Sequence, residues 1–272
     1  MTENRITRMG QIKVYFGKCK RLFGSEKQWK NFVSTAIIMV IISMVTSSEM
    51  FVDYKATRNG GFAIICACIW IGLFNSIQSI CRERDIIKRE YRTGLHISSY
   101  ILAHAAYEFC LCFVETLIVL AFLLIKNITH LPPEGLIFGV IGDYFITLLL
   151  VLYASDMIAI MISCCVKNEN EAMTVMPFVL IIQLVMSGSV FELHGISNLI
   201  SNFTFSKWGL NGIISVANND FIVKAGYIYA GHDGCDSTAS NLLGIWLILI
   251  GFSLLFIFLS TIILKKVDKD SR

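Results

Sequence analysis

The sequence lacks the motifs on which several common classes of enzyme depend. It has no G-x-x-x-x-G-K-[ST] phosphate loop, so the chain does not bind ATP through that motif. It also has no H-E-x-x-H zinc motif and no G-x-S-x-G nucleophile elbow, and its five histidines are scattered. We therefore expect no catalytic residue, no metal site and no cofactor bound by this chain itself.

Charge is scarce as well: 16% of the residues are charged and 55% are hydrophobic. Such a chain is too apolar for a soluble domain. Apolar stretches long enough to cross a hydrocarbon layer, which takes about 20 helical residues, occur six times. The sequence therefore predicts an all-α membrane protein with six transmembrane helices. The expected spans are residues 29–51, 61–81, 99–125, 136–166, 172–191 and 242–264.

Cysteine is present nine times, but not in a pattern that predicts disulfides or a metal site. Eight of the nine fall inside predicted spans or on the predicted cytoplasmic side, and only Cys235 lies in a predicted outer loop. A single thiol cannot form an internal bridge there. We interpret the cysteines as small core residues.

The distribution of Lys and Arg predicts how the chain is oriented. Eighteen of the 23 lie in segments that a six-span topology puts on one side, and five lie on the other. The positive-inside rule then predicts that both ends are cytoplasmic, in a multi-pass protein of the plasma membrane. The expected organisation is a cytoplasmic N-terminus at 1–28, a transmembrane domain at 29–264 and a cytoplasmic tail at 265–272.

The N-terminal segment contains a basic amphipathic helix. From Gln11 to Phe23, apolar residues alternate with four Lys and Arg residues. Helices of this kind lie on an anionic inner leaflet. A nucleic-acid-binding arm has a similar composition, but this helix is tethered to a membrane span. We therefore expect the lipid bilayer, and no nucleic acid, as its partner.

Residues 82–98 form the only strongly charged stretch in the middle of the chain. On a helical period, the apolar residues Ile86, Ile87, Tyr91 and Leu95 share one face, and Arg82, Glu83, Arg89 and Arg92 share the other. The stretch is either a cytoplasmic loop that retains the spans or a helix that docks a partner. Retention requires only Lys and Arg, so the mixture of signs favours docking.

The same stretch carries a resemblance to a known family. Its motif residues are Glu83-Arg84, Arg89-Glu90, Gly94, Ser98-Ser99-Tyr100 and Leu102-Ala103. They resemble the E-R-x(3–4)-R-E-x-x-x-G-x-x-x-S-x-Y-x-L-A run of ABCG-type (White-type) ABC exporters. The family's Glu-Leu-Pro appears here as Glu108-Phe109-Cys110, without the proline kink. The resemblance implies a coupling helix that rests on an ATPase through Glu83, Arg84, Arg89, Glu90 and Gly94, and it implies that 11–23 is the family's connecting helix.

A second stretch extends this resemblance to the outer side. Ser187-Gly188-Ser189-Val190-Phe191, followed by Phe205-Ser206-Lys207-Trp208-Gly209, is similar to the family's S-G-x-x-F and S-x-x-K/W pattern. There the chain dips back as short re-entrant helices, which we expect within 192–241. Re-entrant backbone must be covered by protein, so a second transmembrane subunit is implied.

The resemblance implies a permease subunit of an ATP-driven exporter of a hydrophobic or amphipathic substrate. Its expected partners are an ABC ATPase subunit, which would bind ATP and Mg, and a second transmembrane subunit, identical or paralogous. Spans 2 and 5 would line the path with Phe74, Asn75, Gln78, Pro177, Gln183 and Met186. The alternative is a polytopic membrane scaffold or immunity protein without ATP-driven transport. A co-purifying ATPase would favour the first, and monomeric purification the second.

Four carboxylates fall inside predicted spans: Glu108, Glu115, Asp143 and Asp156. A charged side chain at the middle of the bilayer costs roughly 2.5–3.5 kcal/mol on insertion scales. Each carboxylate should therefore face protein or water. Glu108 and Glu115 are seven residues apart and share a helix face. A functional role is possible, and so is structural pairing of Glu108 and Asp143 near an interface.

Overall fold

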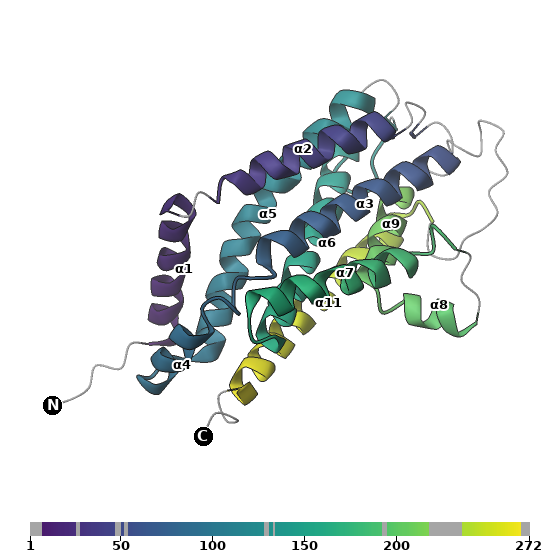
Figure 1. Cartoon of the computed structure of the whole chain (residues 1–272). Coiled ribbons are helices and arrows are strands. Elements are labelled where there is room, and N and C mark those ends of the chain that lie inside the picture. Colours follow the sequence, from purple (N-terminus) through teal and green to yellow (C-terminus); the bar gives the residue numbers. More distant parts are fainter. Residues whose placement is uncertain are drawn as a thin grey trace.

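The computed structural model describes residues 7–25, 28–46, 50–51, 54–127, 131–132, 134–191, 195–217 and 236–267. These residues form an all-helical bundle (Figure 1). Its helices are α1 (Arg8–Ser25), α2 (Lys30–Val45), α3 (Tyr54–Ser76), α4 (Arg84–Arg92), α5 (Ile97–Asn127), α6 (Val140–Cys165), α7 (Glu169–Val185), α8 (Ile196–Ser201), α9 (Phe205–Val216) and α11 (Ala239–Val267). The predicted fold class, all-α, is confirmed.

Helix α6 is the centre of the bundle, and α3, α5, α9 and α11 pack around it. Apolar residues lie on all of its sides, as expected for a helix in the middle of a bundle, and most of its residues are buried. Gly72 lets α3 approach it closely, because a Cβ there would lie 2.8 Å from the Ser155 Cβ. The Ser155 hydroxyl donates to the Ile69 carbonyl at 2.7 Å in the same contact.

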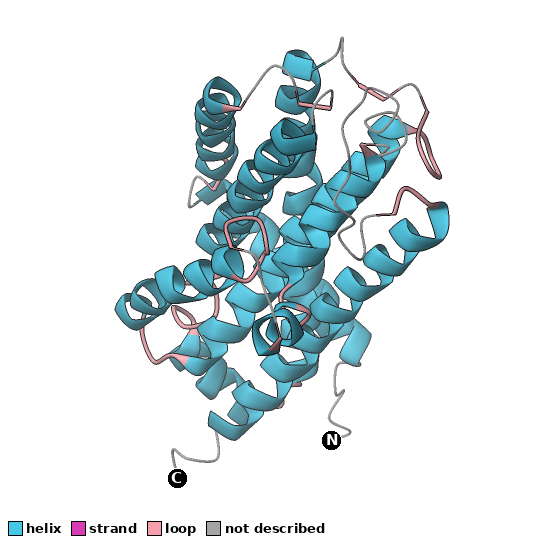
Figure 2. Ribbon diagram, turned by 90° about the vertical axis from the view of Figure 1, so that its right-hand side faces the viewer, coloured by secondary structure: helices cyan, strands magenta, loops and turns pink. Residues whose placement is uncertain are grey.

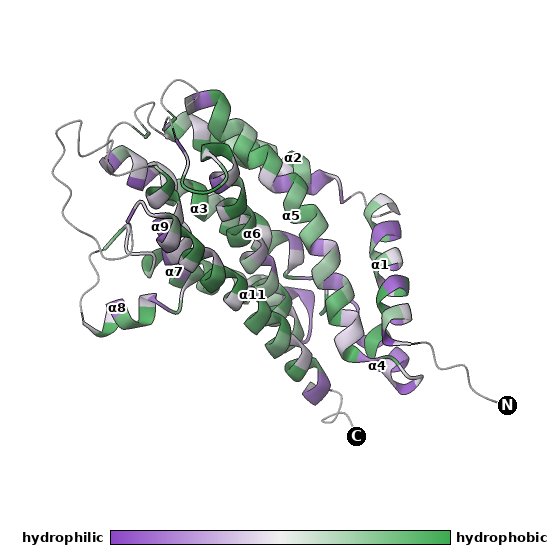
Figure 3. Cartoon of the chain, turned by 180° about the vertical axis from the view of Figure 1, so that it is seen from behind, coloured by the Kyte–Doolittle hydropathy of each residue, from purple (hydrophilic) through white to green (hydrophobic). Residues whose placement is uncertain are grey.

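Four of the described helices, α3, α5, α6 and α11, are long and apolar enough to cross a membrane. The pair α1 and α2, bent by 68°, makes a fifth if it counts as one broken span. Figure 3 shows hydrophobic residues along the long helices and hydrophilic ones on α1 and α4. The chain is therefore a multi-pass integral membrane protein.

The six predicted spans all coincide with helices, but two of those helices are short. Helix α2 has 16 residues and α7 has 17, which correspond to about 24–26 Å against a hydrocarbon core of about 30 Å. The number of six spans therefore stays a prediction. Helix α5, by contrast, runs for 31 residues without a break, as the missing proline at Cys110 allows.

The described chain begins and ends at one end of the bundle. The start of α1, the whole of α4 and the end of α11 lie there, and α9 lies toward the other end (Figure 1). Figure 2 shows the same bundle after a quarter turn. The N-terminal helix, the charged helix and the C-terminal end thus share one side, and its assignment to the cytoplasm stays a prediction.

The predicted outer segment contains two short helices. Helix α9 is almost entirely buried against α3, α6 and α11, and α8 is mostly exposed. Residues 192–194 and 218–235, with Cys235, and the tail beyond Val267 lie outside the described residues. The re-entrant course of this segment remains a prediction. Among the eight described cysteines five are buried, and all eight are free thiols.

Candidate functional site: the charged helix and its supports

The predicted charged stretch folds as α4, a two-turn helix. Asp85 lies in its first turn and Arg89 and Arg92 in its last, which is the arrangement that the helix dipole favours. Ile87 and Leu95 are buried beneath the helix, at 3% and 6% exposure. These local features favour a helix at this position and place apolar side chains between it and the bundle.

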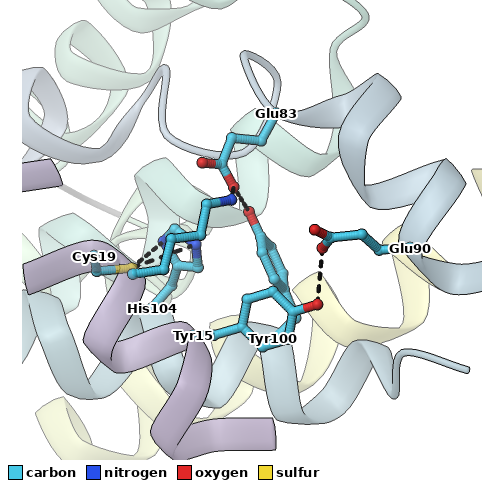
Figure 4. Close-up of polar contacts among 7 residues, drawn as sticks. Tyr15, Cys19, Glu83, Glu90, Tyr100 and His104 are labelled. Carbon is cyan, nitrogen blue, oxygen red and sulfur yellow. Dashed lines mark hydrogen bonds and ion pairs between the residues drawn. The ribbon is translucent and has the colours of Figure 1, made fainter. Parts of the chain in front are cut away.

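Glu83, just before α4, is the centre of a polar network. Its carboxylate accepts a hydrogen bond from Tyr100 Oη at 2.7 Å and pairs with Lys18 Nζ at 2.8 Å. Figure 4 shows Glu83 above Tyr100, which comes from α5. Burial raises the pKa of Glu83, but the hydrogen bonds from Lys18 and Tyr100 outweigh it and hold the pKa below its usual range. Glu83 is therefore a fixed anion that joins α1, α4 and α5.

Glu90, on α4, makes a parallel contact to α1. Tyr15 Oη donates to its carboxylate at 2.8 Å (Figure 4). Burial, and then the hydrogen bond to Glu90, raise the pKa of Tyr15 well above its usual range, so the phenol stays a donor. The Tyr15 ring also packs edge-on against Tyr100, with centroids 5.3 Å apart.

The turn after α4 is tied to α1 as well. Gln11 Nε2 donates to the Gly94 carbonyl at 3.1 Å, and the His96 amide donates to Gln11 Oε1 at 2.9 Å. Gly94 has φ +105°, a backbone conformation that favours glycine. Helix α1 therefore holds α4 at both of its ends and in the middle.

The other side of α4 meets the turn between α6 and α7. Arg84 donates to the Val166 carbonyl at the end of α6. Arg82 lies 4.0 Å from the Glu169 carboxylate at the start of α7. Through these contacts, a displacement of α4 would also displace groups of α1, α5, α6 and α7.

What α4 leaves uncovered is a mixed-charge surface, which we call the exposed face of α4. It consists of Arg82, two residues before the helix, and of Asp85, Ile86, Arg89 and Arg92, all of them exposed. It carries three guanidinium groups and one carboxylate, so its net charge is positive.

The structure corrects the predicted faces of this helix. The helical period predicts Glu83 on the polar outer face, but its side chain turns inward and binds Lys18 and Tyr100. The same period predicts Ile86 and Tyr91 on the buried apolar face, yet they are 37% and 40% exposed. Of the five predicted coupling residues, Glu83, Arg84 and Glu90 bind within the chain through their side chains. Gly94 is exposed but its carbonyl binds Gln11, and Arg89 is exposed.

The network also contains two residues of α1 that sequence reasoning missed as site residues, Tyr15 and Lys18. They are three positions apart and therefore share a helix face. This spacing predicts that the two side chains lie side by side. It does not predict their partners, Glu90 and Glu83, which are 75 and 65 residues away in the sequence.

Cys19 and His104 lie beside this network, with Sγ 3.8 Å from Nε2 (Figure 4). Burial is the main cause that raises the pKa of the Cys19 thiol, to about 12. Cys19 is therefore a protonated thiol and not a nucleophile. The described part of the chain contains no cluster of three or more His, Cys, Asp or Glu residues suited to a metal ion.

The six residues predicted to line the path differ in how far they are exposed. Helices α3 and α7, which correspond to predicted spans 2 and 5, lie in contact within the chain. Phe74 and Pro177 are exposed, but Gln183 is only 5% exposed and accepts a hydrogen bond from the Ser206 amide at 3.3 Å. The half-buried residues are Asn75, Gln78 and Met186. Their role in a path stays a prediction.

Comparison with known proteins places this membrane protein in a class. The model of the ABC-2 type transporter family matches residues 19–218, and the chain belongs to that family. Membrane domains of this family are transport permeases without catalytic residues, and a partner ATPase hydrolyses ATP.

One relative is named both as an ATP-binding protein and as a permease. The chain is similar to the ABC transporter ATP-binding/permease protein Rv1747 of Mycobacterium tuberculosis, with 26% identity over 145 residues. The match covers 52% of this chain and 16% of that protein, so the chain corresponds to a minor part of the relative's length.

Proposed function

We propose that this chain is the permease subunit of an ATP-driven exporter of the White type. Its partner would be a separately encoded ATPase, which binds ATP and Mg. The pairing with an ATPase is supported by the relative, whose name combines ATP binding and a permease in one protein. The substrate that we propose is hydrophobic or amphipathic.

The observation that carries the proposal is the exposed face of α4. Arg89 and Arg92 are exposed in the last turn of α4 and give this face its positive charge, together with Arg82, which also lies 4.0 Å from Glu169 of α7. An acidic surface on a soluble partner would complement them. Ile86, exposed among them, adds the apolar contact that docking surfaces usually contain.

The hydrogen bonds between α4 and its neighbouring helices could transmit a displacement of α4 to the spans. ATP binding would close a pair of ATPase subunits beneath two copies of this chain. Each α4 would follow its ATPase, and its hydrogen bonds to α1, α5 and α6 would carry the displacement into the spans. The path between the two copies would then change from inward-facing to outward-facing.

A paired arrangement is supported by exposed apolar side chains on α3 and α7. Phe74 is 44% exposed, Phe178 is 64%, and Ile181 and Ile182 are more than half exposed. In a dimer of identical or paralogous subunits, these side chains would line an apolar path between spans 2 and 5. An apolar path with few charges fits a hydrophobic or amphipathic substrate.

Charge reversal on the exposed face tests the proposal. The double variant Arg89→Glu/Arg92→Glu should weaken binding of the ATPase at least tenfold, about 1.4 kcal/mol, and abolish substrate-stimulated ATP hydrolysis. Co-purification and ATP hydrolysis are the measurements. The control is Lys265→Glu/Lys266→Glu, which reverses two exposed charges near the end of α11.

The alternative, a scaffold or immunity protein, makes the opposite prediction. Such a protein would purify without an ATPase, and neither double variant would change its behaviour. Wild-type levels of ATPase and of coupled hydrolysis in Arg89→Glu/Arg92→Glu would show that α4 is only a retention loop.

A further inference from the structure

Three carboxyl groups are buried together inside the bundle, away from α4. Glu108 and Glu115 lie on one face of α5, and Asp156 lies opposite them on α6. Their side chains are 4%, 0% and 0% exposed. The proposed function uses none of them.

The end of α3 supplies hydrogen-bond donors to two of the three. Asn75 Nδ2 donates to both oxygens of Glu115, at 2.7 and 2.9 Å. The Ser76 hydroxyl donates to Asp156 Oδ1 at 2.8 Å. Asn75 and Ser76 are the last but one and the last residue of α3.

The third carboxyl group is incompletely paired. Glu108 Oε2 is buried without a hydrogen-bond partner among the residues that the structure describes. Ser76, which donates to Asp156, is also close to Glu108, so these two carboxyl groups share one neighbour. Cys112 Sγ donates to the second oxygen of Asp156 at 2.6 Å.

No basic group neutralises this cluster. Within the described residues, no Lys, Arg or His pairs with any of the three carboxyl groups. Helix α11 has no titratable residue before Lys265, and α2 has none after Lys30. The other titratable groups that face the cluster are weak acids, namely Cys19 of α1, Cys68 of α3, Cys112 of α5 and Tyr153 of α6.

Three neighbouring carboxylates cannot all be ionised in an apolar bundle without a counter-charge. A metal ion could supply that charge, but the described residues contain no arrangement suited to one. A proton supplies it equally well, and a protonated carboxyl group becomes a hydrogen-bond donor. We propose that Glu108, Glu115 and Asp156 form a proton-binding site inside the bundle.

The site is placed to respond to α4, and this step rests on the proposed function. The turn at 77–83 is all that separates Ser76 from α4. A displacement of α4 would shift Asn75 and Ser76 against α5 and α6 and so change the proton affinity of the carboxyl groups. By linkage, protonation would in turn bias the position of α4.

The pH dependence of thermal unfolding tests the proton site in the purified subunit, with or without an ATPase. The folded bundle favours the protonated acids, and the unfolded chain ionises freely, so the wild-type melting temperature should fall from mildly acidic to alkaline pH. Asn and Gln resemble the protonated acids in shape. Asp156→Asn and Glu108→Gln should therefore each remove a large part of this fall, and the exposed control Glu134→Gln should remove none.

A flat wild-type profile, or variants that keep the full wild-type fall, would overturn the proposal. A melting temperature that follows sodium or potassium at constant pH would also overturn it, in favour of a metal cation. Loss of the ATPase with an intact pH profile would instead contradict the proposed function and leave the proton site standing.

The coupling step needs the complex with its ATPase. A non-hydrolysable ATP analogue added in weakly buffered solution should cause uptake or release of protons, read with a pH indicator. Asp156→Asn should reduce that signal by half or more. Binding of the analogue with no proton exchange would contradict the link between the site and α4.

Discussion

Single polar contacts hold α1 to α4, and Lys18 with Glu83 is the central one. The two side chains are 29% and 14% exposed, so water screens their attraction only in part. A hydrogen bond to a charged group stabilises a fold by about 1.5–3 kcal/mol. Tyr100 shares the same carboxylate oxygen, and the three residues act as one unit.

Exchanging the two charges tests this contact at the scale of residues. Lys18→Glu and Glu83→Lys alone should each cost about 1.5–3 kcal/mol of the free energy of unfolding. The double variant Lys18→Glu/Glu83→Lys should recover part of that loss, because opposite charges face each other again. Thermal unfolding of all four proteins, read as a double-mutant cycle, measures the coupling.

The same contact has a defined pH dependence. The pKa of Glu83 is lower in the folded than in the unfolded chain. Its contribution to stability is therefore complete above the ordinary Glu pKa, about 4.3, and is lost as the pH falls through the folded value.

The charge-exchange test has a contradicting outcome. Single variants at Lys18 or Glu83 that retain the full wild-type stability at neutral pH would show that α1 is held by apolar packing alone.

At the scale of elements, the junction between α4 and α5 depends on a glycine. The amides of Thr93 and Gly94 close the last turn of α4, and Gly94 then takes φ +105° so that α5 can start at Ile97. A Cβ at Gly94 would meet no atom within 4 Å, so the backbone angle alone makes glycine necessary.

Gly94→Val should therefore destabilise the junction by about 1–3 kcal/mol through backbone strain and lower coupled ATP hydrolysis. Gly24→Val is the matched control, since Gly24 also has open space around it but no positive φ. Limited proteolysis after residue 92 and ATP hydrolysis are the measurements. Equal behaviour of the two variants would argue against a strained junction.

At the scale of the whole molecule, periodicity and composition predicted a helical membrane protein and the position of each main helix. These features follow from local spacing of apolar residues. The inward turn of Glu83 did not follow, because it depends on Lys18, which is 65 residues away in the sequence. The shortness of α2 and α7 was missed for a related reason: hydropathy does not mark where a helix ends.

The burial of Glu108, Glu115 and Asp156 was predicted in outline, since costly charges in spans must face protein. The sequence did not predict that the three carboxyl groups lie together. No sequence pattern relates Asn75 and Ser76 of α3 to the carboxyl groups that they bind on α5 and α6. Asp143 proved structural: its carboxylate accepts the amide hydrogens of Leu136 and Ile137, at 2.7 and 3.1 Å, and of Phe138.

The central claim is that an ATPase docks on the exposed face of α4, and cross-linking in intact membranes tests it most directly. A photoreactive amino acid at position 89 should form a covalent product with a protein that contains a phosphate-loop motif, identified by mass spectrometry. The same amino acid at position 265 should give little or none of that product. Cross-linking at position 89 only to lipid, or to proteins without such a motif, would contradict the account.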